Sequence, residues 1–135
     1  MSANAEIVRR AYAAAGGSEP DVDTLVELYA PDHVLTTEWG IGERKRYRGL
    51  DGYLEARAET GELLGDFRNE LEDVVDAGDE VVVAVVRASG RGQASGTPVE
   101  MRLGAVVRLR DGKIVDTEYF VDVDQALAAA GLKSP

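Results

Sequence analysis

The chain has 135 residues, with 15 Lys and Arg against 25 Asp and Glu, one His and no Cys. A chain of this length normally forms one domain, here residues 1–135. The net charge of −10 argues against nucleic acid or an anionic membrane surface as a partner, because both attract clusters of Lys and Arg. Without Cys there are no disulfides or thiolate metal sites, and one His cannot form a histidine-rich zinc site.

Membrane and secretory signals are also missing from the sequence. The longest purely apolar run extends only from Val81 to Val86, far short of the ~20 residues that a membrane helix needs. The first ten residues include Glu6 and lack the apolar core of a secretory signal. We therefore expect a cytoplasmic protein.

The chain opens with two predicted helices. Residues 4–15 place apolar side chains on one helical face and are followed by two glycines. Residues 22–29 repeat this spacing, with Asp21 or Asp23 as the N-cap and Pro31 as the stop. From residue 33 the pattern changes.

A strand, a loop and a third helix are predicted next. Residues 33–39 alternate with a period of two and contain β-branched side chains, which indicates a strand. Residues 40–49 are rich in charge and bounded by glycines, so we expect a surface loop. Its basic side chains could guide an anion, although such a run is usually a solvated surface. Residues 50–64 return to helical spacing.

The second half predicts an antiparallel meander followed by a short helix. The Asp111-Gly112 dipeptide is the strongest hairpin signal, because both residues tolerate the positive φ angles of a tight turn. A last helix is predicted to begin with Asp124 as its cap and to end before Gly131. The predicted strands cover residues 67–76, 80–89, 99–110 and 113–123.

This order of elements predicts the α+β class, with one curved antiparallel sheet wrapped around three N-terminal helices. Such a sheet leaves a conical space that can hold a small ligand. The strand that contains Val81 to Val86 is apolar on both faces. One face would meet the helices, and we expect the other to meet a second subunit in a homodimer.

Four segments resemble the nuclear transport factor 2-like superfamily, and within it the polyketide-cyclase-like (SnoaL-like) and ketosteroid-isomerase-like branch. The similarity covers nearly the whole chain and implies a cystatin-like α+β barrel with a pocket between helices and sheet, usually in a homodimer. The superfamily includes both enzymes and binding domains, so the fold does not settle the function. The segments are LVELYAPDHVL, YRGLDGYL, VVRLRDGKIVDTEYF and DQALAAAGL.

The resemblance also implies positions for a ketosteroid isomerase site. The tyrosine that donates to the enolate oxygen in that family matches Tyr12. The carboxylate base falls on Thr37, with Glu38 one residue further, and the protonated Asp that donates a second hydrogen bond falls on Ala105. Since Ala105 cannot donate a hydrogen bond, we do not expect steroid isomerisation by that arrangement.

Three residues are candidates for catalysis. Tyr12 would donate a hydrogen bond into the pocket, or else pack as an aromatic side chain. Glu38 would be a general base if a bulge turned it inward, although strict alternation points it away from Thr37 and Trp39. His33 is the one side chain with an ordinary pKa near neutrality, but a His after a helix more often meets the helix carbonyls or solvent.

Nine further residues are predicted to bind the ligand. Arg57 with Tyr53 could hold an anionic group, or Arg57 could form a solvated ion-pair face with its neighbouring glutamates. The remaining ones share the concave face by alternation, and an apolar wall with a few hydroxyls suits a hydrophobic ligand that has one or two oxygens. These wall residues are Leu35, Thr37, Trp39, Met101, Leu103, Thr117 and Tyr119.

Two functions remain open at this point. One is a cofactor-independent isomerase or cyclase that acts on a hydrophobic carbonyl compound, with no metal, where Tyr12 polarises an oxygen and Glu38 or His33 moves a proton. The alternative is a non-catalytic dimeric module that binds a small apolar ligand or a protein.

Overall fold

A computed structural model describes residues 2–16, 19–37 and 44–132. One sheet with the strand order β2-β1-β6-β5-β4-β3 forms its centre. The elements in chain order are α1 (Ala3–Ala15), α2 (Val22–Leu28), β1 (Tyr29–Thr37), β2 (Lys45–Arg48), α3 (Gly49–Leu63), β3 (Leu64–Gly78), β4 (Val81–Gly92), β5 (Pro98–Arg110), β6 (Lys113–Phe120) and α4 (Val123–Ala129).

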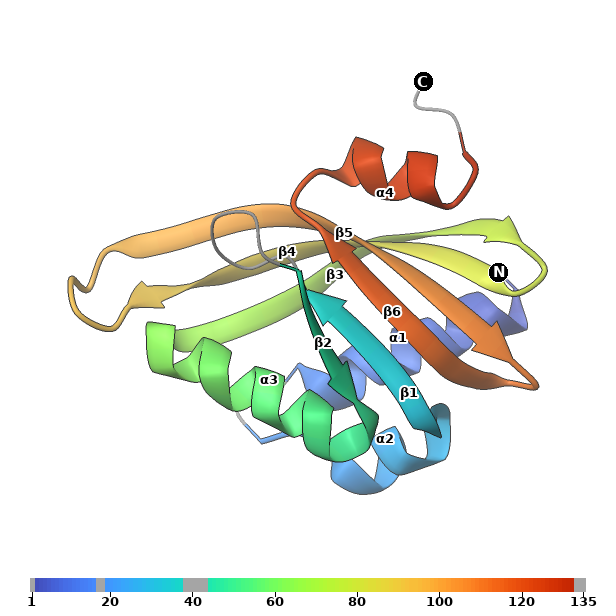
Figure 1. Ribbon diagram of the computed structural model, residues 1–135. Helices are drawn as coiled ribbons and strands as arrows, with labels where there is room; N and C mark the ends of the chain where they lie inside the picture. Colours follow the sequence, from blue (N-terminus) through green and yellow to red (C-terminus); the bar gives the residue numbers. More distant parts are fainter. Residues whose placement is uncertain (1, 17–18, 38–43, 133–135) are drawn as a thin grey trace.

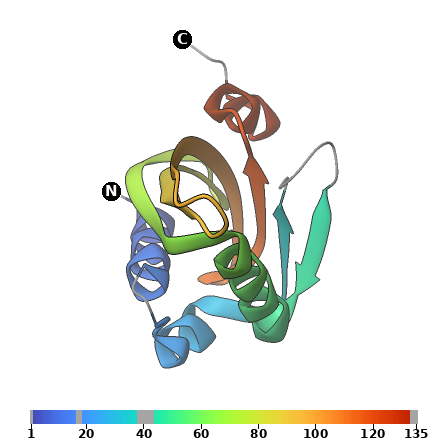
Figure 2. The ribbon, with the colours of Figure 1, turned by 90° about the vertical axis from the view of Figure 1, so that its left-hand side faces the viewer.

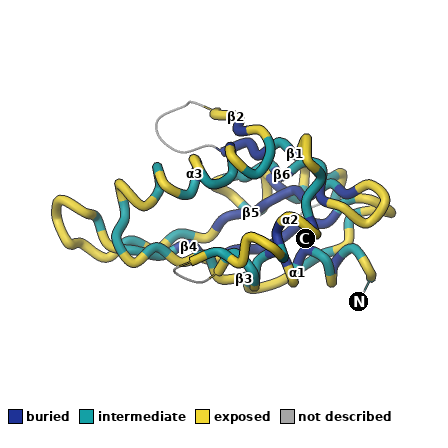
Figure 3. The backbone as a smooth tube through the Cα atoms, turned by 90° about the horizontal axis from the view of Figure 1, so that it is seen from below, coloured by how far each residue is buried: buried dark blue, intermediate teal, exposed yellow. Residues whose placement is uncertain are grey.

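The sheet curves around the helices without closing on itself. Helices α1, α2 and α3 lie on one side of it and α4 lies on the opposite side (Figures 1 and 2). Strands β2 and β3 are the two edges. The predicted α+β class, with a curved sheet around three helices, is confirmed. Figure 3 shows the buried backbone concentrated along the middle of the sheet, whereas the hairpin ends are exposed.

The junction of α2 and β1 differs from the prediction. Asp21 caps α2 by accepting from the Thr24 amide, as expected, but the helix ends at Leu28 and the strand begins at once with Tyr29. Pro31 therefore lies inside β1, not at the end of a helix. This is possible because the pairing of β1 with β6 shifts register between Tyr29 and Val34, so no regular ladder bond is needed there.

The charged stretch predicted as a loop contains a strand. Residues 45–48 form β2, which pairs antiparallel with β1. Only Tyr47 of this strand is buried, at 7 % exposure, and its neighbours are exposed. One inward-facing aromatic side chain was too weak a signal for a strand. Of the rest of the predicted loop, Arg44 precedes β2 and Gly49 begins α3, and residues 40–43 lie outside the described residues.

The meander of β3 to β6 is antiparallel throughout, as predicted. Asp111 and Gly112 both have positive φ angles, 53° and 76°, which confirms the tight hairpin between β5 and β6. The sheet as a whole is mixed, because β1 pairs parallel with β6 and places Leu35 opposite Thr117. A purely antiparallel sheet was therefore wrong at this one pair.

Strand β4 is apolar on both faces, and α4 covers part of the outer one. Val82, Ala84 and Val86 pack on the helix side. On the other side Val83 packs with Ala126 of α4. This helix begins after Asp122, not after Asp124 as predicted, because the Asp122 side chain accepts from the Asp124 amide. The homodimer through this face stays a prediction.

Candidate functional site

A cavity of about 80 Å³ lies between the concave face of the sheet and α3. Strands β1, β3, β5 and β6 provide most of its wall. Most of the side chains around it are apolar or carry a hydroxyl, and no carboxylate is part of the lining that the structure describes. The lining residues are Tyr29, His33, Leu35, Thr37, Tyr53, Ala56, Arg57, Thr60, Phe67, Asn69, Leu103, Thr117 and Tyr119.

Alternation along β1 and β6 explains why most of the predicted wall lies together. His33, Leu35 and Thr37 share one face of β1, and all three line the cavity. The parallel pairing sets Leu35 opposite Thr117 on β6, and Tyr119 follows on the same face. Leu103, Tyr53 and Arg57 also line the cavity, as predicted.

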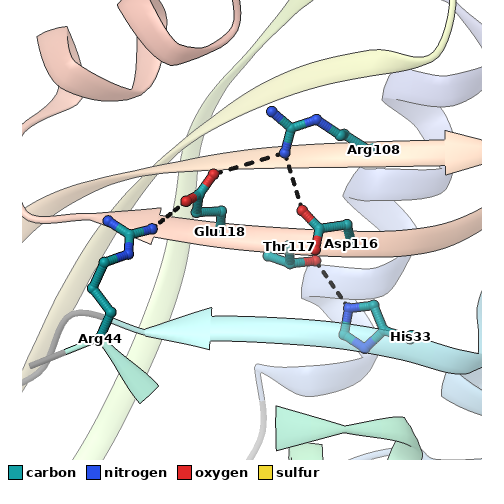
Figure 4. A network of polar contacts seen from close by, with 6 residues as sticks. All are labelled: His33, Arg44, Arg108, Asp116, Thr117 and Glu118. Carbon is teal, nitrogen blue, oxygen red and sulfur yellow. Dashed lines mark hydrogen bonds and ion pairs between the residues drawn. The ribbon is translucent and has the colours of Figure 1, made fainter. Parts of the chain in front are cut away.

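His33 is buried in this cavity, with 2 % of its surface exposed. Its Nε2 lies 3.1 Å from Oγ1 of Thr117 (Figure 4), and its ring stands edge-on to Tyr29 with the centroids 4.5 Å apart. Burial lowers the pKa of the His33 imidazole to about 4, although the Asp32 carboxylate partly opposes this. The imidazole is therefore neutral at neutral pH, and the alternative that His33 meets solvent is wrong.

Tyr12 reaches the cavity through Tyr119. The two hydroxyl oxygens are 2.6 Å apart, and either can donate. Tyr119 lines the main cavity, whereas Tyr12 lines a smaller adjoining space of about 50 Å³. Burial raises the pKa of both phenols above the ordinary value, so both stay protonated and able to donate. The structure thus puts Tyr12 behind the residue that faces the cavity.

Arg57 points toward α1 rather than toward the glutamates of its own helix. Its Nη1 donates to the Ala15 carbonyl at 2.7 Å. Glu59 instead accepts from Lys45 and from the Tyr47 hydroxyl, at 2.9 Å and 2.8 Å. Burial raises the pKa of Tyr53, and the charge and hydrogen bond of Arg57 oppose this rise. The guanidinium is consequently part of the cavity wall and is held there by α1.

Asn69 is a polar wall residue that sequence reasoning missed. Its Oδ1 is buried and has no hydrogen-bond partner in the described part of the chain. The sequence pattern could have indicated this position, because Phe67, Asn69 and Leu71 alternate with exposed charged residues along β3. Tyr29, Ala56, Thr60 and Phe67 were also missed.

Met101 is a predicted site residue that is not part of the cavity lining. Met101 lies on β5 opposite Ala88, half-buried, two residues before Leu103, which does line the cavity. Glu38 and Trp39 lie outside the described residues. Among the residues described, no group of three His, Cys, Asp or Glu side chains could hold a metal ion.

The outer face of β6 carries an ion-pair network. Arg108 donates to Asp116 at 3.0 Å and lies 3.7 Å from Glu118, which also pairs with Arg44. Figure 4 shows these carboxylates on the opposite side of β6 from Thr117, as alternation predicts. Arg44 belongs to the predicted basic cluster, so at least part of that cluster pairs with surface carboxylates.

The cavity, the curved sheet and the helix arrangement define a pocket protein of the nuclear transport factor 2-like class. A family model, the SnoaL-like domain, matches residues 8–117, and the chain therefore belongs to the SnoaL-like family. No curated protein matches the chain. In the described residues, no helix is long and apolar enough to cross a membrane.

Solved structures share the fold of this chain. An NTF2-like protein from Burkholderia thailandensis E264 is 29% identical over 100% of both chains, with a TM-score of 0.74. Bal32a, from a soil-derived mobile gene cassette, is 24% identical over 87% of this chain and 88% of its own, with a TM-score of 0.75. TerC, co-crystallised with polyporic acid, is 20% identical over 96% and 99%, with a TM-score of 0.73.

Proposed function

We propose that this chain is a cofactor-independent enzyme that moves a proton on a small hydrophobic carbonyl compound, as isomerases and cyclases do. The observation that supports this most is the buried, neutral His33 in a cavity whose other walls are mainly apolar or hydroxylated, with Arg57 and Asn69 and no carboxylate among the described lining residues. The fold also accommodates small organic molecules elsewhere, since TerC was co-crystallised with polyporic acid.

His33 is the proton acceptor in this proposal. With a pKa of about 4, the imidazole is deprotonated at neutral pH and is about as basic as an aspartate. When Nε2 carries the proton and donates to Oγ1 of Thr117, Nδ1 keeps its lone pair for the substrate. This is the tautomer in which Nδ1 can act as the base.

Tyr119 stabilises the charge that develops on the substrate oxygen. Nδ1 of His33 removes a proton from the carbon next to the carbonyl, and the C–H electrons form the enolate double bond. Tyr119 accepts a hydrogen bond from Tyr12 and donates a hydrogen bond from its own hydroxyl to the enolate oxygen. In an isomerase the proton on His33 then returns to another carbon. In a cyclase the enolate carbon attacks a second carbonyl, whose π electrons move to its oxygen, and that alkoxide takes the proton from His33.

Deuterium exchange at the α-carbons of 2-butanone tests the proposal. Protein in D2O should speed the exchange, followed by proton NMR, above the buffer rate. His33→Gln should return the rate to that of buffer, and Tyr119→Phe should lower it by about 10²-fold or more. Tyr12→Phe should cost about tenfold, since it acts through Tyr119.

Tyr47→Phe is the matched control, because this tyrosine donates to Glu59 and is not part of the cavity lining. It should leave the exchange rate unchanged. If 2-butanone binds but wild-type protein exchanges no faster than buffer, the proposal is wrong. The alternative of a non-catalytic dimeric binding module then explains the binding.

A further inference from the structure

A second hollow adjoins the cavity on the side of α2. It has a volume of about 600 Å³ and lies between α2, the first residues of β1 and the first turn of α3. Its inner walls are mainly apolar, with Leu25 fully buried and Val26 at the lip 55 % exposed. We call it the α2–α3 groove. It is lined by Leu25, Val26, Tyr29, Ala30, Pro31, Asp32, His33, Arg48, Gly49, Leu50, Asp51 and Tyr53.

The groove and the cavity share three aromatic side chains. Tyr29, His33 and Tyr53 line both spaces. The Tyr29 ring lies 4.5 Å from the His33 ring and 6.1 Å from the Tyr53 ring, measured between centroids. These rings therefore form the wall between a small inner space and a much larger outer one, and the proposed base belongs to that wall.

The volumes of the two spaces limit what the cavity alone can bind. A cavity of about 80 Å³ admits the compact end of a ligand but not a long chain or a fused ring system. The groove offers about 600 Å³ on the other side of His33. The groove therefore offers the adjoining room for the rest of a ligand whose carbonyl lies at His33.

We propose that the α2–α3 groove binds the apolar tail of the same carbonyl compound, so that the substrate class is an elongated ketone with an uncharged tail. This rests on the proposed function. The groove adjoins the site across three shared residues, which favours a part of the same ligand as its occupant. Its rim has one cation, Arg48, and two carboxylates, Asp32 and Asp51, which gives no surplus of positive charge for an anionic tail.

A series of 2-alkanones from 2-butanone to 2-decanone tests the groove. Dissociation constants are measured by NMR titration. For wild-type protein, each methylene that enters the groove should tighten binding by about fourfold, as full burial of a CH2 group predicts. 2-Butanone stays within the cavity and reports on that space alone.

Two substitutions on α2 separate the groove from general surface effects. Val26→Arg places a long charged side chain at the groove lip, and it should abolish the dependence on chain length while 2-butanone binds as before. Val22→Arg is the matched control, since Val22 is also exposed, at 37 %, on the same helix but does not line the groove. It should keep the wild-type dependence. Because both valines are exposed, both variants should fold, which circular dichroism checks.

The outcomes of the two proposals can be told apart. If 2-butanone binds and exchanges but longer ketones bind no tighter, the groove proposal is wrong and the proposed chemistry stands. The same holds if both α2 variants remove the dependence of the dissociation constant on chain length equally. If chain length matters and only Val26→Arg removes the effect, the groove binds the tail even where no ketone exchanges. If no ketone binds at all, both proposals are wrong.

Discussion

Acidification tests the buried imidazole directly, because burial gives His33 a different pKa in the folded and unfolded states. An exposed His titrates near 6.5, whereas the pKa of His33 in the folded protein is about 4. Between these values the unfolded chain binds a proton that the folded one does not. The contribution of the neutral His33 to the free energy of unfolding is therefore complete above pH 6.5 and is lost as the pH falls to about 4.

The size of this effect follows from the shift of the pKa. A difference of about 2.5 pH units corresponds to roughly 3 kcal/mol in the free energy of unfolding. Of this, about 2 kcal/mol should disappear between pH 7 and pH 4.5. The carboxylates of the chain also titrate in this range, so wild-type protein must be compared with His33→Gln, which shares them.

Urea unfolding at several pH values measures the difference, and proton NMR gives the pKa itself. The sequence contains one His, so its Cε1 proton signal needs no assignment. On acidification from pH 7 to pH 4.5, the free energy of unfolding should fall by about 2 kcal/mol more for wild-type protein than for His33→Gln. The Cε1 proton signal should titrate near pH 4. A midpoint of 6 or above, or equal pH dependence of the two proteins, would show a hydrated imidazole and refute the reasoning.

Two further substitutions probe packing around the sheet. Gly104→Val should destabilise the protein by about 1–3 kcal/mol in urea unfolding, because a Cβ there would lie 2.5 Å from the Cβ of Ala126 on α4. An unchanged free energy of unfolding would mean that α4 does not pack on β5. Asn69→Leu should stabilise the protein by about 1 kcal/mol, since it removes a buried Oδ1 that has no partner in the described structure. A loss of stability in urea would show that this amide is satisfied.

Much of the fold could be predicted because local signals and tertiary structure agree. The Asp111-Gly112 turn and the alternation along β4 and β5 each follow from backbone preferences or from burial on a defined face. The prediction was wrong where a single contact decides the structure. Tyr47 alone among the residues of β2 is buried, and Pro31 fits into β1 only because the pairing with β6 is irregular there.

The walls of the site were easier to predict than its chemistry. Alternation placed Leu35, Thr37 and Thr117 correctly, since a strand that is buried on one face repeats every second residue. The environment of His33 depends on where β1 begins and on its parallel partner β6, which are tertiary features. Tyr12 was identified from the resemblance to ketosteroid isomerases, but its contact with Tyr119 joins residues far apart in the sequence.

The position of His33 also connects the two proposals. The resemblance to ketosteroid isomerases puts the base at Thr37, and this hydroxyl lines the cavity but has no acidic group. His33 lies four residues earlier on the same face of β1, about 13 Å back along an extended strand. Thr37 is the last residue of β1, whereas His33 belongs to the wall shared with the α2–α3 groove. A base at that wall acts on a substrate that also occupies the groove, which is why ligand length and the ionisation of His33 should together govern activity.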